Sequence, residues 1–131
     1  MMDKEKTVEL LKTVSANCEL KPLSDCLALE QMFKASLPLE LWILLSFKDG
    51  IIGAKNSLSQ MRIMSLTEIQ SAPQELQVDF PDKGLLPLID CLDNDFLVYD
   101  VARQNYSLFN IVDEVSFNSY SSLCEFLQKK A

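Results

Sequence analysis

The stretch that decides the fold is LLPLIDCLDNDFLVYDVARQNYSLFNIV, residues 85–112. It contains three blocks rich in branched and aromatic residues, at residues 85–91, 96–101 and 106–112, and this composition is typical of β-strands. The links between the blocks are about four residues long, which is the usual length of a hairpin connection. The stretch therefore predicts three antiparallel strands joined as a meander.

Helical patterns dominate the chain before this stretch. In residues 3–16 the apolar residues recur at steps of three and four, which predicts an amphipathic N-terminal helix. Residues 17–23 are predicted to form a connector, because Pro22 cannot donate a backbone hydrogen bond. Ser24 or Asp25 is then expected to cap a second helix.

A third helix is predicted between Pro38 and Asp49-Gly50. Proline suits the first helical position because its missing N–H would have no partner there. The helix is apolar almost all round: if Leu41, Leu44 and Leu45 face the core, the other side carries Leu39, Trp42, Ile43 and Phe47. The favoured interpretation is that the N-terminal helix covers this second face. The alternative is that Trp42 and its neighbours anchor a partner or a second copy of the chain.

Ser65 and Glu68 have the spacing of a capping box. They predict a short helix over residues 66–70, which Pro73 is expected to stop. Residues 51–60, before the box, are predicted to form a loop. This part of the chain therefore leads from the helices to the meander without a long element of its own.

A final helix is predicted over residues 120–129, begun by one of the serines Ser119, Ser121 or Ser122. The order of the predicted elements indicates an α+β fold: helices come first, an antiparallel sheet follows, and a helix comes last. The predicted partition is an N-terminal amphipathic helix with its connector at residues 1–20, and one domain over residues 21–131.

Composition and charge narrow the range of functions. The chain has 131 residues, 48% hydrophobic and 24% charged, as expected of one globular domain. It has no histidine, which excludes Ser-His-Asp and Cys-His catalysis because both need an imidazole. With 19 acidic and 12 basic residues, the net charge of −7 opposes binding to nucleic acid. A basic or neutral protein partner is expected instead.

Cysteines and hydropathy give no sign of a metal, a cofactor or a membrane. The four cysteines contain no CxxC spacing and resemble no zinc ligand set, so they are expected to be reduced; they are Cys18, Cys26, Cys91 and Cys124. The N-terminus does not resemble a secretory signal, and no stretch approaches the roughly 18 apolar residues of a membrane helix. The expected location is the cytoplasm.

An acidic series lies on or beside the predicted strand ends: Asp90, Asp93, Asp95, Asp100, Asp113 and Glu114. Paired carboxylates serve in glycosidases and two-metal hydrolases, but hairpin spacing supplies neither convergent geometry nor a cleft, so no catalytic residue is predicted. The carboxylates are either solvated caps that protect strand edges or a negative patch that steers a basic partner. On the second interpretation the predicted partner-binding residues are Asp93, Asp95, Asp113 and Glu114, together with Trp42.

Several motifs, taken in their order, resemble the SMI1/KNR4 (SUKH) superfamily. They are Leu37-Pro38 before a helix, SLTEI at residues 65–69, LLPLIDCLDNDFLVYDV at residues 85–101 and LCEFL at residues 123–127. Two departures concern loops: Asp49-Gly50 is followed by isoleucines instead of a second glycine, and Asn94-Asp95 stands where glycines are common. Asparagine tolerates a positive φ, so the second departure is compatible with the same turn.

The resemblance implies a twisted, mainly antiparallel sheet flanked by helices, without enzymatic activity. Many bacterial members are immunity proteins that bind and block a cognate toxin domain, such as a nuclease or a deaminase. Other relatives are regulatory modules. The alternative function is therefore a regulatory or scaffold module that binds an endogenous protein or self-associates, for example as a homodimer.

Overall fold

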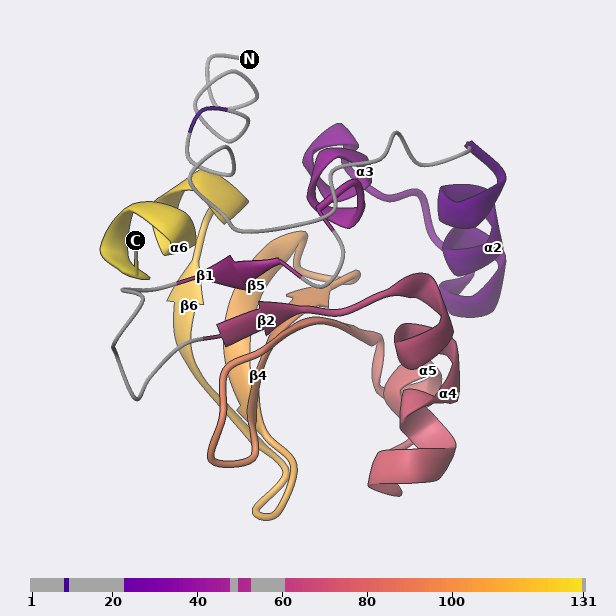
Figure 1. Ribbon diagram of the computed structural model, residues 1–131. Coiled ribbons are helices and arrows are strands. Elements are labelled where there is room, and N and C mark those ends of the chain that lie inside the picture. The colour runs from indigo at the N-terminus through magenta and orange to yellow at the C-terminus, as the bar shows by residue number, and fades with distance from the viewer. Residues whose placement is uncertain (1–8, 10–22, 48–49, 53–60, 131) are drawn as a thin grey trace.

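The computed structural model describes residue 9 and residues 23–47, 50–52 and 61–130. A six-stranded sheet lies at its centre, with the strands side by side in sequence order and every neighbouring pair antiparallel (Figure 1). The strands are β1 (Ile51–Ile52), β2 (Met61–Ile63), β3 (Leu85–Asp90), β4 (Asp95–Asp100), β5 (Asn105–Asn110) and β6 (Val115–Tyr120). The helices are α2 (Leu23–Phe33), α3 (Leu39–Leu45), α4 (Leu66–Leu76), α5 (Phe80–Lys83) and α6 (Leu123–Lys130). The α+β class is therefore confirmed.

The predicted meander is present as β3, β4 and β5. Leu86 pairs with Tyr99, and Tyr99 pairs with Tyr106, so these three side chains share one face of the sheet. The second predicted helix is confirmed as α2, but it begins at Leu23, so Ser24 and Asp25 lie inside the helix instead of capping it. The predicted helix over residues 3–16 lies, apart from residue 9, outside the described residues.

Helices cover both faces of the central strands. Tyr106 and Phe109 are three residues apart on β5 and therefore point to opposite faces. The ring of Phe109 packs edge-on against Phe80 of α5, with centroids 6.0 Å apart. On the other face, the Tyr106 hydroxyl donates a hydrogen bond to Glu40 of α3. The sheet is thus the middle layer of the molecule.

Glu40 joins three elements that are distant in sequence. One of its carboxylate oxygens accepts from the Tyr106 hydroxyl and from the backbone N–H of Leu123, 3.2 Å away, at the start of α6. Burial raises the pKa of Tyr106, and the hydrogen bond to Glu40 raises it further, so the phenol remains a donor. This carboxylate therefore ties α3, β5 and α6 together.

Helix α3 differs from the prediction at both ends. Pro38 precedes the helix in an extended conformation, φ −68° and ψ 154°, and is the N-cap instead of the first helical residue. The helix ends at Leu45, because Ser46 and Phe47 donate to carbonyls three residues back and tighten the last turn. The Gly50 carbonyl then accepts from Ile63 N–H at 2.9 Å, which brings the chain to the edge of β2.

The start of the predicted loop at residues 51–60 is a strand. Ile51 and Ile52 form β1 and pair with Arg62 and Met61 of β2. Pairing with β2, the next strand along the chain, fixes this short segment, and residues 53–60 lie outside the described part. The loop prediction is therefore wrong at its first two residues.

The burial of the two faces of α3 agrees only in part with the prediction. Leu41, Leu44 and Leu45 are buried, as expected. On the other side Leu39 is 50% exposed, while Trp42 and Ile43 are half-buried against the core. Phe47 is buried in the core, which contradicts the prediction, because the chain has already left the helix and turned inward there.

The capping box of α4 is confirmed. Ser65 Oγ accepts from Glu68 N–H at 3.3 Å, and Glu68 Oε1 accepts from Ser65 N–H at 3.0 Å. Pro73 does not stop the helix, which continues to Leu76. Proline removes one helical hydrogen bond, but the turn that follows it packs Leu76 against the core.

The C-terminal elements are only partly as predicted. β6 covers residues for which no strand was predicted, and Tyr120, the predicted start of the last helix, belongs to that strand. Helix α6 begins at Leu123, after Ser122. Ser122 Oγ accepts from Glu125 N–H at 3.1 Å, so one of the three proposed cap serines is confirmed.

In the described part of the chain, no helix is long and apolar enough to cross a membrane.

Candidate functional site

Two hairpin turns lie next to each other at one end of the sheet, at the bottom of Figure 1. One joins β3 to β4 and the other joins β5 to β6. Asn110 Nδ2 donates to Asp95 Oδ1 at 2.8 Å, and Ile111 N–H donates to the Asn94 carbonyl at 2.9 Å. These two hydrogen bonds fix the turns relative to each other.

The carboxylates of these turns form the acidic hairpin end, which we define as Asp90, Asp93, Asp95, Asp113 and Glu114. It contains four of the five predicted partner-binding residues. The fifth, Trp42, lies on α3, and nothing in the described structure brings it to this end. Asp100 terminates β4 at the opposite end, where Asp100 pairs with Leu85 and Asn105. The acidic series is therefore divided between the two ends of the sheet.

The turn between β3 and β4 has an unusual backbone. Leu92, Asp93 and Asn94 have consecutive positive φ values of 72°, 54° and 67°. Asn and Asp tolerate this left-handed region, as expected for Asn94, but a branched side chain such as leucine is uncommon there. Asp90 Oδ1 accepts from Leu92 N–H at 3.0 Å, and Asp95 N–H donates to the Leu92 carbonyl at 3.0 Å. These bonds hold the turn while Leu92 remains 37% exposed.

The turn between β5 and β6 is organised by Asn110. Its side-chain oxygen accepts from the N–H groups of Val112 at 3.0 Å and Asp113 at 2.9 Å. Glu114, with a φ of 54°, places its carboxylate 3.1 Å from Lys83 Nζ. Both side chains of this ion pair are well exposed, so solvent screens it and its contribution to stability is small. Asp113 remains exposed beside it.

Sequence reasoning missed the exposed apolar residues of this end. Val112 is 69% exposed and Val115 is 52% exposed, beside the partly exposed Leu92. The available signal was local: Asp93 directly follows Leu92 in a predicted link, and Asp113 directly follows Val112, the last residue of a predicted strand. The surface therefore combines carboxylates with apolar side chains, a combination that can contact a protein.

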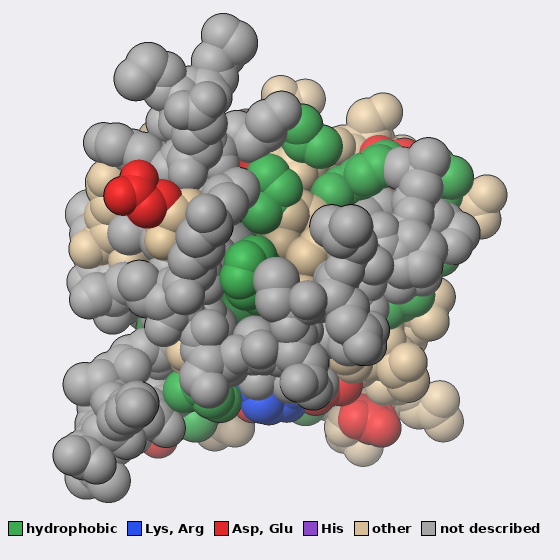
Figure 2. Space-filling view, turned by 45° about the horizontal axis from the view of Figure 1, so that its top comes forward, with side chains coloured by type: hydrophobic (Ala, Val, Ile, Leu, Met, Phe, Trp, Pro, Cys, Tyr) green, Lys and Arg blue, Asp and Glu red, His purple; other side chains and the backbone are tan. Residues whose placement is uncertain are grey.

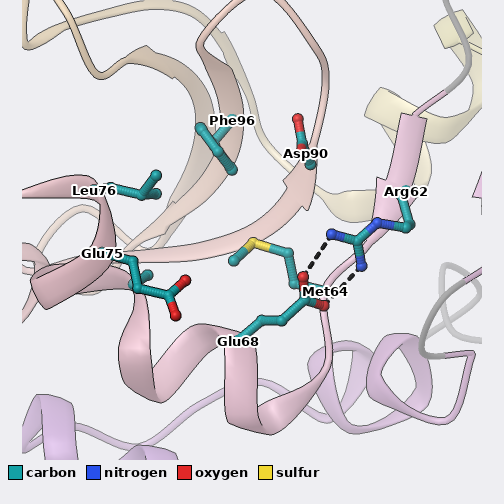
Figure 3. A pocket seen from close by; sticks show the side chains of 8 residues that line it. Arg62, Met64, Glu68, Glu75, Leu76, Asp90 and Phe96 are labelled. Atoms are coloured by element: carbon teal, nitrogen blue, oxygen red, sulfur yellow. Dashed lines mark hydrogen bonds and ion pairs between the residues drawn. The ribbon is translucent and has the colours of Figure 1, made fainter.

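A pocket of about 190 Å³ opens beside the acidic hairpin end (Figure 3). Glu75 and Leu76 of α4 line one side, and Asp90 and Phe96, from paired positions of β3 and β4, line the other. Phe96 pairs with Phe109, so the pocket lies on the face that α5 also covers.

An ion pair forms part of the wall of this pocket, on the right in Figure 3. The two terminal guanidinium nitrogens of Arg62, Nη1 and Nη2, donate to Glu68 Oε1 and Oε2, at 2.7 and 2.5 Å. The hydrogen bond from Arg62 lowers the pKa of Glu68, against the opposing effect of burial. Because Glu68 also belongs to the capping box, the pair connects β2 to the start of α4.

Trp42 contributes a separate surface around α3. Its side chain is half-buried, and in the described structure its buried Nε1 has no hydrogen-bond partner. Figure 2, turned so that the top of Figure 1 comes forward, shows hydrophobic side chains on this side of the molecule. The predicted N-terminal helix lies, apart from residue 9, outside the described residues, so its contact with α3 stays a prediction.

Among the described residues, no group of three Asp, Glu or Cys side chains is arranged to hold a metal ion. The sequence matches no protein-family model and no curated protein with which it was compared. The candidate site is thus defined by its own geometry: two mutually hydrogen-bonded turns with carboxylates and exposed apolar residues.

Proposed function

We propose that this chain is a non-catalytic protein-binding domain whose acidic hairpin end contacts a basic partner. The observation that carries the proposal is the combination, on two joined turns, of five carboxylates with exposed Leu92 and Val112. Carboxylates of one sign accelerate the encounter with a cationic surface. Exposed apolar side chains then provide short-range affinity once water is excluded.

The partner that we propose is a toxin domain, which makes the chain an immunity protein. The resemblance of the sequence to the SMI1/KNR4 superfamily supports this choice, because many bacterial members of that superfamily block a cognate toxin. A toxin that cleaves or modifies nucleic acid needs a cationic groove for its substrate, and such a groove complements an acidic surface. On this proposal the domain acts in the cytoplasm, without a cofactor, by occluding that groove.

A second candidate is a regulatory or scaffold module that self-associates. The exposed strand β6 favours it, because an uncovered sheet edge is a natural pairing surface. This candidate differs from the first in needing no toxin.

The test uses a pair of variants with the same change in net charge. Asp93→Asn with Asp113→Asn removes two carboxylates from the acidic hairpin end, and Glu9→Gln with Asp82→Asn removes two exposed carboxylates elsewhere. The wild-type chain and both variants are immobilised and exposed to lysate of the native host. We expect a basic protein to be retained by the wild-type chain and the control variant but lost from the first variant.

The captured protein is then expressed alone and together with this chain. We expect it to stop cell growth alone and to be harmless when co-expressed. A captured protein that is harmless alone would refute the immunity proposal and favour the regulatory candidate. Equal retention by all three chains would refute the acidic hairpin end as the contact surface.

A further inference from the structure

Strand β6 is the exposed edge of the sheet. Every residue from Val115 to Ser119 is exposed, whereas the interior residues of its neighbour β5 are buried. Val115 is 52% exposed and Phe117 is 38% exposed, and their spacing places both on the same face of the strand. Two apolar side chains on an exposed edge are a recognised site for pairing with another strand.

The outer side of β6 is open for backbone hydrogen bonding. Within the described part of the chain, no backbone hydrogen bond joins Val115, Ser116 or Phe117 to anything except β5. Natural edges are commonly blocked by charged residues, proline or a bulge. β6 has neither charge nor proline, but Asn118, with a φ of 52°, lies at a shift of the β5–β6 register. The regular open edge is therefore Val115 to Phe117.

The absence of charged residues on β6 indicates which kind of strand can pair with this edge. Residues 115–124, VSFNSYSSLC, contain no charged residue, although the chain has a net charge of −7. A strand from a basic protein would meet no carboxylate on β6 itself. Two copies of this chain repel each other where their carboxylates approach, so they can meet most favourably along an uncharged strand. The edge therefore fits a second copy better than a basic segment.

We infer that β6 pairs with β6 of a second copy in an antiparallel dimer whose two-fold axis passes through Ser116. This register places Val115 opposite Phe117 of the other chain, twice, and so covers both exposed apolar side chains. It places Glu114 opposite Asn118 of the other chain, so no carboxylate faces another. The two-fold symmetry closes the assembly at two copies, and the bulge at Asn118 limits the length of the paired segment. The inference does not rest on the proposed binding of a toxin.

Sedimentation equilibrium of the purified chain tests this dimer. Over a range from about 10 µM to about 1 mM, we expect the average mass to rise from that of one chain toward that of two. Phe117→Glu should weaken the association at least about tenfold, because it buries a carboxylate against Val115 of the other copy. Leu39→Glu changes another exposed apolar residue, on α3, and should leave the association unchanged.

Cross-linking tests the register itself. A residue on the two-fold axis lies opposite its own copy, so Ser116→Cys should form an intermolecular disulfide on mild oxidation. Ala102→Cys, in the exposed turn between β4 and β5, should not. A single-chain mass at every concentration would overturn the dimer. Dimerisation with equal cross-linking of both cysteine variants, or equal weakening by both glutamate variants, would overturn its placement at β6.

Discussion

Strands β5 and β6 are neighbours with similar composition and opposite environments. Each has six residues and no charge, and each contains a phenylalanine and a tyrosine. β5 is buried along its four interior residues, whereas β6 is exposed along all but its last residue. Composition alone therefore does not decide which strand is covered. The difference arises from what packs against each strand.

The covering helices reach β5 on both faces. Phe80 of α5 contacts Phe109 on one face, and Glu40 of α3 accepts from Tyr106 on the other. Only the final residue of β6, Tyr120, receives similar cover, from Phe126 of α6 at a ring distance of 5.3 Å. The part of the sheet that the helices cover accounts for stability. We assign contact with other protein chains to the bare part, which comprises β6 and the acidic hairpin end.

The largest expected effect on stability is at Phe109 of β5, and the comparison is with Phe117 of β6. Phe109→Ala removes a buried ring and leaves a cavity against Phe80, which should lower the free energy of unfolding by about 3 to 5 kcal/mol. Phe117→Ala removes a ring that is already partly in water and should cost less than about 1 kcal/mol. Urea denaturation of the monomer measures both. Equal losses would contradict the distinction between the covered and bare strands.

A smaller effect on stability is expected at Glu40 of α3, which connects strand β5 to helix α6. Glu40→Ala leaves the buried Tyr106 hydroxyl and the Leu123 N–H without their acceptor and should cost about 1 to 3 kcal/mol. Glu40→Gln keeps a side-chain oxygen that can accept and should cost less. Thermal denaturation of both variants checks this order. If alanine is tolerated as well as glutamine, Glu40 does not hold these elements together.

The smallest effect on stability is expected at the ion pair between β2 and α4. Arg62 lowers the pKa of Glu68 below its ordinary value of 4.5, so the pair stabilises the folded state above that pH. This contribution is lost as the pH falls through the lowered pKa. Because both side chains are about one third exposed, solvent screening should keep it below about 1 kcal/mol.

A double-mutant cycle over pH measures this contribution. The coupling between Glu68→Gln and Arg62→Gln should be present near pH 7 and absent near pH 3. The single variant Glu68→Gln should reduce the acid-induced loss of stability. A coupling that is the same at both pH values would contradict the assignment of the shift to Arg62.

The meander and the capping box could be predicted because their signals are local. Residues 85–112 combine strand-forming blocks with short links, and Ser65 and Glu68 are only three residues apart. The continuation of α4 past Pro73 could not be predicted in the same way, because it depends on Leu76 packing against a distant part of the core. Local rules describe the unfavourable effect of proline but not the tertiary contact that outweighs it.

The bare part of the sheet shows the same limit. The positions of Asp93, Asp95, Asp113 and Glu114 at strand ends follow from the hairpin pattern. Their proximity follows as well, because Asp95 pairs with Asn110 within the predicted meander. The strand β6 does not follow: its sequence VSFNSY is half serine and asparagine, and it becomes a strand by pairing with β5. The positive φ of a leucine at position 92 is also set by hydrogen bonds that no sequence pattern reports.

The most direct test of the central claim, that the acidic hairpin end binds a basic protein, is the association rate with the captured partner. Stopped-flow measurements at low and at physiological ionic strength compare the wild-type chain, Asp93→Asn with Asp113→Asn, and the control Glu9→Gln with Asp82→Asn. We predict that the first variant associates about tenfold more slowly at low salt, while the control remains within about twofold of the wild type. Equal slowing by the two variants, or rates that do not depend on salt, would contradict the claim.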